Sequence, residues 1–120
     1  MNDMKVLVVD DDKLNRMLIS KLLGKYGVVS SQAENGYAAI DLAKSEDFDF
    51  IFMDYNMPKL SGAECAGMIK EHYAEKNKKA PVLVCISADE GCCSDSVFDK
   101  YLLKPFNIED LKDLLTQTGV

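Results

Sequence analysis

Residues 48–62, FDFIFMDYNMPKLSG, decide how this chain folds and where its chemistry lies. The stretch opens with an apolar run at residues 50–53, which Asp54 ends abruptly. A strand that is buried on both faces is apolar at every position, and parallel sheets contain such strands. The residue after such a strand lies at the carboxyl edge of the sheet, where open α/β folds bind their ligands. Asp54 is therefore either a functional side chain held in place by a rigid strand or an acid that merely starts a turn.

Length and composition favour one globular domain. The chain has 120 residues, of which 48% are hydrophobic and 28% are charged, and this suits a single core. The net charge is -6, whereas a nucleic-acid-binding domain usually carries a basic face. No apolar run is long enough to cross a bilayer, and the first residues lack a signal-peptide pattern. We expect one domain over residues 1–120 in the cytoplasm, with no direct contact to nucleic acid or membrane.

The four cysteines do not have the spacing of a zinc site. They stand at positions 65, 85, 92 and 93, form no CxxC pair and share the chain with one histidine. Reduced thiols are expected in the cytosol. Cys85 lies in an apolar run and is predicted to be in the core. The adjacent Cys92 and Cys93 are either a redox feature or two incidental thiols.

Runs with strand character alternate with helical patterns along the chain. We expect strands at residues 5–9, 28–33, 50–53, 81–86 and 101–103. Helices are expected over residues 13–26, around 39–43, and over 61–76 and 108–116. In the first of them the residues that recur at helical spacing are Leu14, Met17, Leu18, Leu22 and Leu23. The alternation predicts a parallel sheet with helices on both faces.

Polar residues follow four of the predicted strands. Asp10 and Asp11 follow the first strand, Asp54 the third, Ser87 the fourth and Lys104 the fifth. Because parallel strands point the same way, these side chains can converge on one edge of the sheet. Neighbouring carboxylates repel one another, and a fold tolerates them best at an exposed strand end or around a cation. A helix cap would explain Asp12, the third acid of the run, but not Asp10 and Asp11.

This set of groups suits phosphoryl chemistry around a hard cation. Oxygen-only ligands favour Mg²⁺ or a similar ion. A carboxylate beside such an ion can attack a phosphoryl group and form an aspartyl phosphate. Lys104 would offset charge on the phosphoryl oxygens, and Ser87 could donate a hydrogen bond to one of them. An ionised Asp54 would need no general base.

The ordered motifs resemble the receiver domains of two-component response regulators and hybrid histidine kinases. The residues that carry the resemblance are Val8-Val9-Asp10-Asp11, Asp54-Tyr55-Asn56-Met57-Pro58 with Gly62, Ser87-Ala88, and Tyr101 ahead of Lys104-Pro105-Phe106. The resemblance covers nearly the whole chain, and residues 11–16 are nearest to receivers of hybrid kinases and phosphorelays. It implies an α/β, flavodoxin-like, doubly wound sheet of five parallel strands in the order 2-1-3-4-5.

The resemblance also implies a metal site around the phosphoacceptor. Asp54 would accept the phosphoryl group. Asp11 and Asp54 would bind Mg²⁺ or Mn²⁺ directly, and Asp10 would orient a metal-bound water. Asn56 would contribute its backbone carbonyl to the metal.

The resemblance implies a switch as well as a site. Lys104 would contact the phosphoryl group, Ser87 would move to bond it, and Tyr101 would follow Ser87. The donor would be a histidine kinase or a histidine phosphotransfer protein, and a homodimer is a further partner that the family allows. The domain would not be an enzyme beyond assisting its own phosphorylation and dephosphorylation.

The chain departs from the family between Ser87 and Lys104, where the interval is short. In the family this interval holds a full helix, the fourth, between the fourth and fifth strands. Residues 89–100 have a poor helix composition, so this helix is predicted to be short, distorted or missing. This departure favours one alternative, a receiver-like interaction module without phosphotransfer. A phosphohydrolase of the haloacid-dehalogenase type is the other alternative, but that family has a second acid where this chain has Asn56.

Overall fold

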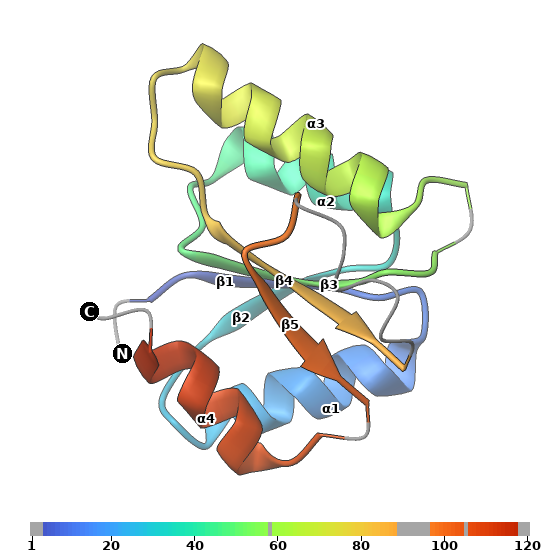
Figure 1. Cartoon of the computed structure of the whole chain (residues 1–120), viewed down its shortest axis with the longest axis vertical. Helices are drawn as coiled ribbons and strands as arrows, with labels where there is room; N and C mark the ends of the chain where they lie inside the picture. Colours follow the sequence, from blue (N-terminus) through green and yellow to red (C-terminus); the bar gives the residue numbers. More distant parts are fainter. Residues whose placement is uncertain (1–3, 58, 89–96, 105, 118–120) are drawn as a thin grey trace.

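A parallel five-stranded sheet forms the centre of the molecule in the computed structural model, which describes residues 4–57, 59–88, 97–104 and 106–117 (Figure 1). The strand order is β2-β1-β3-β4-β5, and each neighbouring pair is parallel. The fold and the order 2-1-3-4-5 are therefore confirmed. The strands are β1 (Val6–Val9), β2 (Ser30–Ala33), β3 (Phe50–Asp54), β4 (Val82–Ser87) and β5 (Lys100–Leu103).

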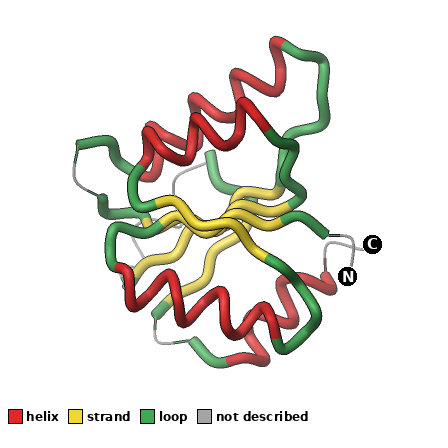
Figure 2. The backbone as a smooth tube through the Cα atoms, turned by 180° about the vertical axis from the view of Figure 1, so that it is seen from behind, coloured by secondary structure: helices red, strands yellow, loops and turns green. Residues whose placement is uncertain are grey.

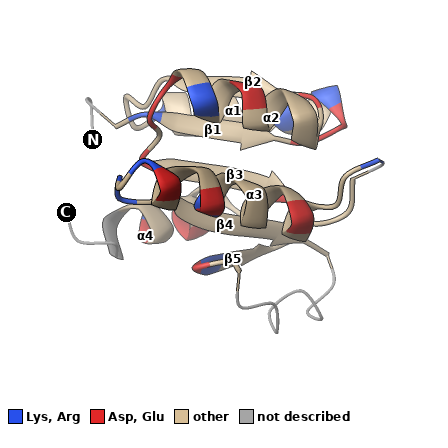
Figure 3. Ribbon diagram, turned by 90° about the horizontal axis from the view of Figure 1, so that it is seen from above, with Lys and Arg blue, Asp and Glu red and all other residues tan. Residues whose placement is uncertain are grey.

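Helices cover both faces of this sheet, as the alternation predicted. In the described part of the chain they are α1 (Lys13–Gly24), α2 (Gly36–Ser45), α3 (Gly62–Glu75) and α4 (Ile108–Gln117). Helices α2 and α3 lie on one face, and α1 and α4 lie on the other (Figures 1 and 2). Figure 3 shows residues of both charge signs along α2 and α3.

The core has one layer on each face of the sheet. Every residue of β1 and β3 is buried, because side chains that alternate along a central strand meet helices on both sides. Leu7, Ile51 and Met53 pack with residues of α2 and α3. Val8 and Phe52 belong to a second cluster with residues of α1 and α4. These strands hold the acids that follow them on a rigid support.

The apolar residues of the first helix do not all face the sheet. Its buried residues are Ile19 and Leu23, whereas Leu14, Met17 and Leu18 are 75%, 50% and 54% exposed. Apolar residues occupy more than one side of this helix, so the spacing identified the helix without identifying the face that packs on the sheet. The exposed residues form a patch, called here the α1 patch, in the first turns after the acids.

Other expectations on the chain have mixed outcomes. Cys85 is buried in the core, as predicted, and Cys65 is buried as well. The family's helix between the fourth and fifth strands would fall at residues 89–100, most of which lie outside the described residues, as do Cys92 and Cys93. The predictions for this helix and for the two cysteines therefore stay predictions. Within the described ranges, none of the helices has the length and apolar character needed to cross a membrane.

Candidate functional site at the carboxyl edge of the sheet

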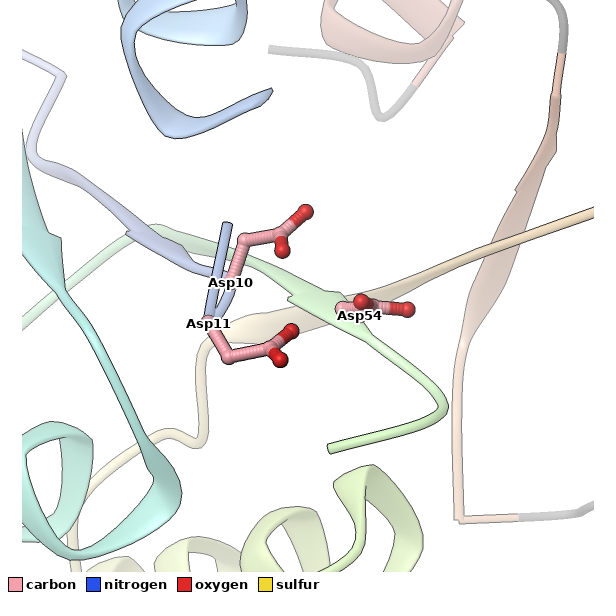
Figure 4. Close-up of side chains that lie close together, drawn as sticks. All are labelled: Asp10, Asp11 and Asp54. Atoms are coloured by element: carbon pink, nitrogen blue, oxygen red, sulfur yellow. The ribbon is translucent and has the colours of Figure 1, made fainter. Parts of the chain in front are cut away.

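The carboxyl ends of β1 and β3 bring three acids together. In the parallel register Val9 lies beside Met53, so Asp10 and Asp54 leave neighbouring strands at the same level. Asp10, Asp11 and Asp54 each offer a carboxylate oxygen, and these oxygens lie within 4.8 Å of one another. Figure 4 shows the carboxylates of Asp10, Asp11 and Asp54 gathered at the ends of β1 and β3.

Burial and hydrogen bonding make this cluster suited to a cation. Asp10 is fully buried, and its Oδ1 accepts a hydrogen bond from the Asp12 N–H at 2.9 Å. No hydrogen-bond partner within the described ranges reaches its Oδ2, which is also buried. A buried carboxylate oxygen without a partner is costly, and a cation is the group that would satisfy it. The oxygen-only donor set fits a hard ion such as Mg²⁺.

The acids also perturb one another. The pKa of Asp54 is raised to about 6, first by burial and then by the charge of Asp10, while Lys104 opposes the shift. Burial likewise raises the pKa of Asp10. Because both groups are driven toward the neutral form, the metal-free site is electrostatically unfavourable when it is ionised. A divalent cation would relieve this cost.

Ser87 and Lys104 reach the same edge from the next two strands. The Lys104 N–H donates to the Ser87 carbonyl at 2.8 Å, which joins the ends of β4 and β5. Ser87 is 2% exposed, and Asp54 lies beside Ile86 in the register of β3 and β4. The positive charge of Lys104 acts on both Asp10 and Asp54. The predicted acids, hydroxyl and ammonium therefore gather at one edge.

Tyr101 and Asn56 flank this edge. Tyr101 is half-buried on β5, and its hydroxyl lies 3.5 Å from the Phe98 carbonyl. Asn56 is exposed, and its backbone N–H donates to Asp54 Oδ1 at 3.3 Å. Asp12 caps α1 by accepting a hydrogen bond from the Leu14 N–H, so capping explains the third acid of the run as expected.

Arg16 is the residue near the site that the sequence did not single out. It lies in the first turn of α1, and its Nη1 donates to the Asp10 carbonyl oxygen at 2.7 Å. In the sequence, an arginine six positions after an acid is typical of an ordinary surface residue. The feature that could have indicated its contact with the site is its position just after the acids, in the first turn of a predicted helix.

The fold and the site define a class, the flavodoxin-like domains with an acidic cluster at the carboxyl edge of the sheet. A family model described as "Response regulator receiver domain" matches residues 6–116. The chain therefore belongs to the response regulator receiver domain family, which confirms the resemblance.

The sequence relatives are much longer than this chain. Hybrid signal transduction histidine kinase E of Dictyostelium discoideum is 39% identical over 94% of this chain, which spans 7% of that kinase. Sensor protein GacS of Pseudomonas syringae pv. syringae is 31% identical over 97% of this chain, which spans 14% of it. The chain thus matches a small part of each relative.

Solved receiver structures agree with the fold. The receiver domain of Ssk1, crystallised with the histidine phosphotransfer signaling protein Ypd1 of Saccharomyces cerevisiae, has a TM-score of 0.85 and 29% identity, covering 97% of this chain and 88% of that chain. TrrA from Thermotoga maritima, in complex with Mg(2+)-BeF, has a TM-score of 0.83 and 32% identity, covering 95% of this chain and 97% of that one.

Proposed function

We propose that this receiver domain accepts a phosphoryl group on Asp54 in the presence of Mg²⁺ or Mn²⁺ and switches conformation as a result. The observation that carries the proposal is the convergence of three carboxylates close to the positive charge of Lys104. One of them has a buried oxygen that meets no hydrogen-bond partner among the described residues. Asp11 and Asp54 would hold the cation together with the Asn56 carbonyl, and Asp10 would orient a water bound to the cation. We further propose that residues 1–120 are a single receiver domain.

The chemistry follows from where the side chains lie. An Asp54 carboxylate oxygen attacks phosphorus, a new O–P bond forms, and the N–P bond of a phosphohistidine breaks, so that the imidazole leaves and takes up a proton. A bound divalent cation would supply positive charge against the phosphoryl oxygens. Lys104 adds an ammonium at the same edge, and Ser87 can donate its hydroxyl proton to a phosphoryl oxygen. The domain acts once on itself and turns over no separate substrate.

The switch would start from the added charge. A phosphoryl group brings roughly two negative charges at neutral pH and three acceptor oxygens. Ser87 and Lys104 are joined through their backbones at the end of β4 and β5, so a shift of Ser87 toward the phosphoryl group would act directly on β5. Tyr101 lies on that strand and packs with the side of the core that contains α3. It is the residue whose orientation would report the change.

Phosphorylation itself is tested by mass. Incubation with MgCl₂ and acetyl phosphate should add one phosphoryl group to the wild-type chain, and Asp54→Asn should add none. Beryllofluoride should bind the wild type and shift the NMR signals of Ser87 and Tyr101. If the wild-type chain gains no phosphoryl group and does not bind beryllofluoride, the result would favour the alternative, a receiver-like interaction module. Turnover of a phosphate ester that Asp54→Asn abolishes would instead indicate a phosphohydrolase.

The α1 patch gives the proposed partner a place to dock. Leu14, Met17 and Leu18 are exposed, and they begin within about one helical turn of Asp11. A phosphohistidine donor must approach Asp54 from outside the carboxyl edge, so a surface next to the acids would lie in its interface. We assign the patch to a histidine phosphotransfer protein, because a similar receiver is crystallised with one.

Leu18→Gln is expected to slow phosphotransfer from such a donor about tenfold, because an apolar anchor in an interface is worth on the order of 1–2 kcal/mol. The donor is any phosphorylated histidine phosphotransfer protein that labels the wild-type domain. Labelling by acetyl phosphate, which needs no docking surface, should stay unchanged. Met68→Gln is the matched control, since Met68 is 47% exposed on α3. Equal slowing by both variants would count against the α1 patch.

A further inference from the structure

Arg16 is a cation beside the acids whose hydrogen bond goes to the main chain. Its Nη1 donates to the Asp10 carbonyl oxygen at 2.7 Å. Its backbone N–H donates to the Asp12 carbonyl oxygen at 3.1 Å, which starts the hydrogen bonding of α1. Arg16 therefore fastens both ends of the acidic loop, residues 10–12, to the first turn of the helix.

The choice of acceptor keeps the carboxylates available. A bidentate arginine–carboxylate pair would occupy the oxygens that a cation needs. The ion pairs recorded within the described ranges join Lys5 to Glu46, Lys70 to Asp99 and Lys78 to Asp47, and they leave Arg16 out. Arg16 thus contributes charge and a strong tether without taking a carboxylate oxygen of Asp10 or Asp11.

A tether of this kind opposes the repulsion between the acids. Three carboxylate oxygens within 4.8 Å of one another repel, and an unfastened loop would move them apart. The Asp10 carboxylate is fixed at one oxygen by the Asp12 N–H, so its direction depends on the path of this same loop. The carbonyl that Arg16 holds belongs to Asp10 itself.

We propose that Arg16 is a positioning residue: it fixes the acidic loop so that Asp10 and Asp11 stay directed toward Asp54, and it thereby sets the affinity of the site for a divalent cation. This inference rests on the proposed function, because it concerns the same cation site. It assigns to Arg16 a role that acts through the acids, with no contact to the phosphoryl group.

The sign of the effect separates positioning from simple charge. Removal of a nearby positive charge alone would make the acidic site more attractive to Mg²⁺. Loss of the tether would instead spread the ligands and weaken binding, as loss of groups that orient metal ligands typically does by 10- to 100-fold. The two explanations therefore predict changes in opposite directions.

Titration of the folded proteins with MgCl₂ by calorimetry, without any phosphodonor, measures this directly. Arg16→Met keeps an unbranched stem and helix propensity, and its Mg²⁺ Kd is expected to rise about tenfold. Lys21→Met, which removes the same charge farther along α1, should leave the Kd unchanged or slightly lower. Arg16→Lys, which keeps the charge but lacks the planar fork, should have a Kd between those of wild type and Arg16→Met.

A Kd for Arg16→Met equal to or below that of the wild type would overturn the inference. If Arg16→Met does not fold by circular dichroism, a wild-type Kd in Arg16→Lys would overturn it in the same way. A wild-type protein that binds no Mg²⁺ would overturn the proposed cation site itself. The failure of the inference and the failure of the proposed function are therefore distinguished by the wild-type titration.

Discussion

Asp54→Asn is expected to stabilise the metal-free protein at pH 7.5 by roughly 2–3 kcal/mol, although it removes the proposed phosphoacceptor. The pKa of Asp54 is about 6 in the folded protein against an ordinary value of 3.8, and burial is the main cause. One pKa unit corresponds to about 1.4 kcal/mol, so the ionised side chain costs the folded state on this scale. An amide of the same shape avoids the cost, and its oxygen can still accept from the Asn56 N–H.

The stability gained by Asp54→Asn should increase as the pH rises. Between the unfolded and folded pKa values of Asp54, the folded state holds a proton that the unfolded chain has released. The contribution of Asp54 to the stability of the wild type therefore falls as the pH rises from about 4 to about 6, and the fall is complete above that range. The stability difference between Asp54→Asn and wild type should be near zero at pH 4 and reach its full size above pH 6.

Urea unfolding in the presence of a chelator measures this difference across the pH range. Asp41→Asn on α2 is the matched control, because it makes the same substitution at an exposed acid and should change stability by less than about 0.5 kcal/mol. Added MgCl₂ should stabilise the wild type and narrow the gap, since a ligand of the folded state shifts the equilibrium toward it. A variant that is less stable than wild type at pH 7.5 would contradict the account of the acid cluster.

The sequence predicted the parts of the site that depend on the strands. The runs at residues 6–9 and 50–53 are apolar at every position because both faces of β1 and β3 are covered, and this property can be read directly from the residues. Once these strands are parallel, Asp10 and Asp54 must leave them at the same edge. The order of the five strands came from the family resemblance, since the alternation of strands and helices fits several orders.

Side-chain reach and burial could not be predicted in the same way. Helical spacing located α1, but apolar residues on several sides of it hid the fact that Ile19 packs inward while Leu14 points to solvent. The bond from Arg16 to the Asp10 carbonyl depends on the angle between β1 and α1, which no local pattern encodes. The raised pKa of Asp54 depends on burial by residues from distant segments.

The start of α3 shows how closely the backbone is packed against the proposed phosphoacceptor. The Gly62 N–H donates to the Tyr55 carbonyl at 3.0 Å. A Cβ atom at Gly62 would lie 2.5 Å from the Asp54 carbonyl oxygen and 3.0 Å from the Tyr55 Cα. These are main-chain atoms, so the contact cannot be relieved by turning a side chain. The restriction is steric and comes from the proximity of the strand end.

Gly62→Ala is therefore expected to destabilise the protein by about 2 kcal/mol or more, because overpacking against backbone forces the helix and the strand end apart. The same displacement moves Asp54, and a shift of about 1 Å at a reacting group can cost on the order of a hundredfold in rate. Labelling by acetyl phosphate should fall at least tenfold in the fraction that remains folded. Urea unfolding at low temperature and intact mass measure the two effects.

Gly67→Ala separates steric crowding from the general effect of replacing a glycine in α3. Gly67 lies five residues farther along the helix, and a Cβ there would meet nothing within 4 Å. Alanine favours the helix over glycine by up to about 1 kcal/mol, so this variant should be slightly more stable than wild type and label normally. If Gly62→Ala behaves like Gly67→Ala in both measurements, the backbone at Gly62 does not support Asp54 in the way described.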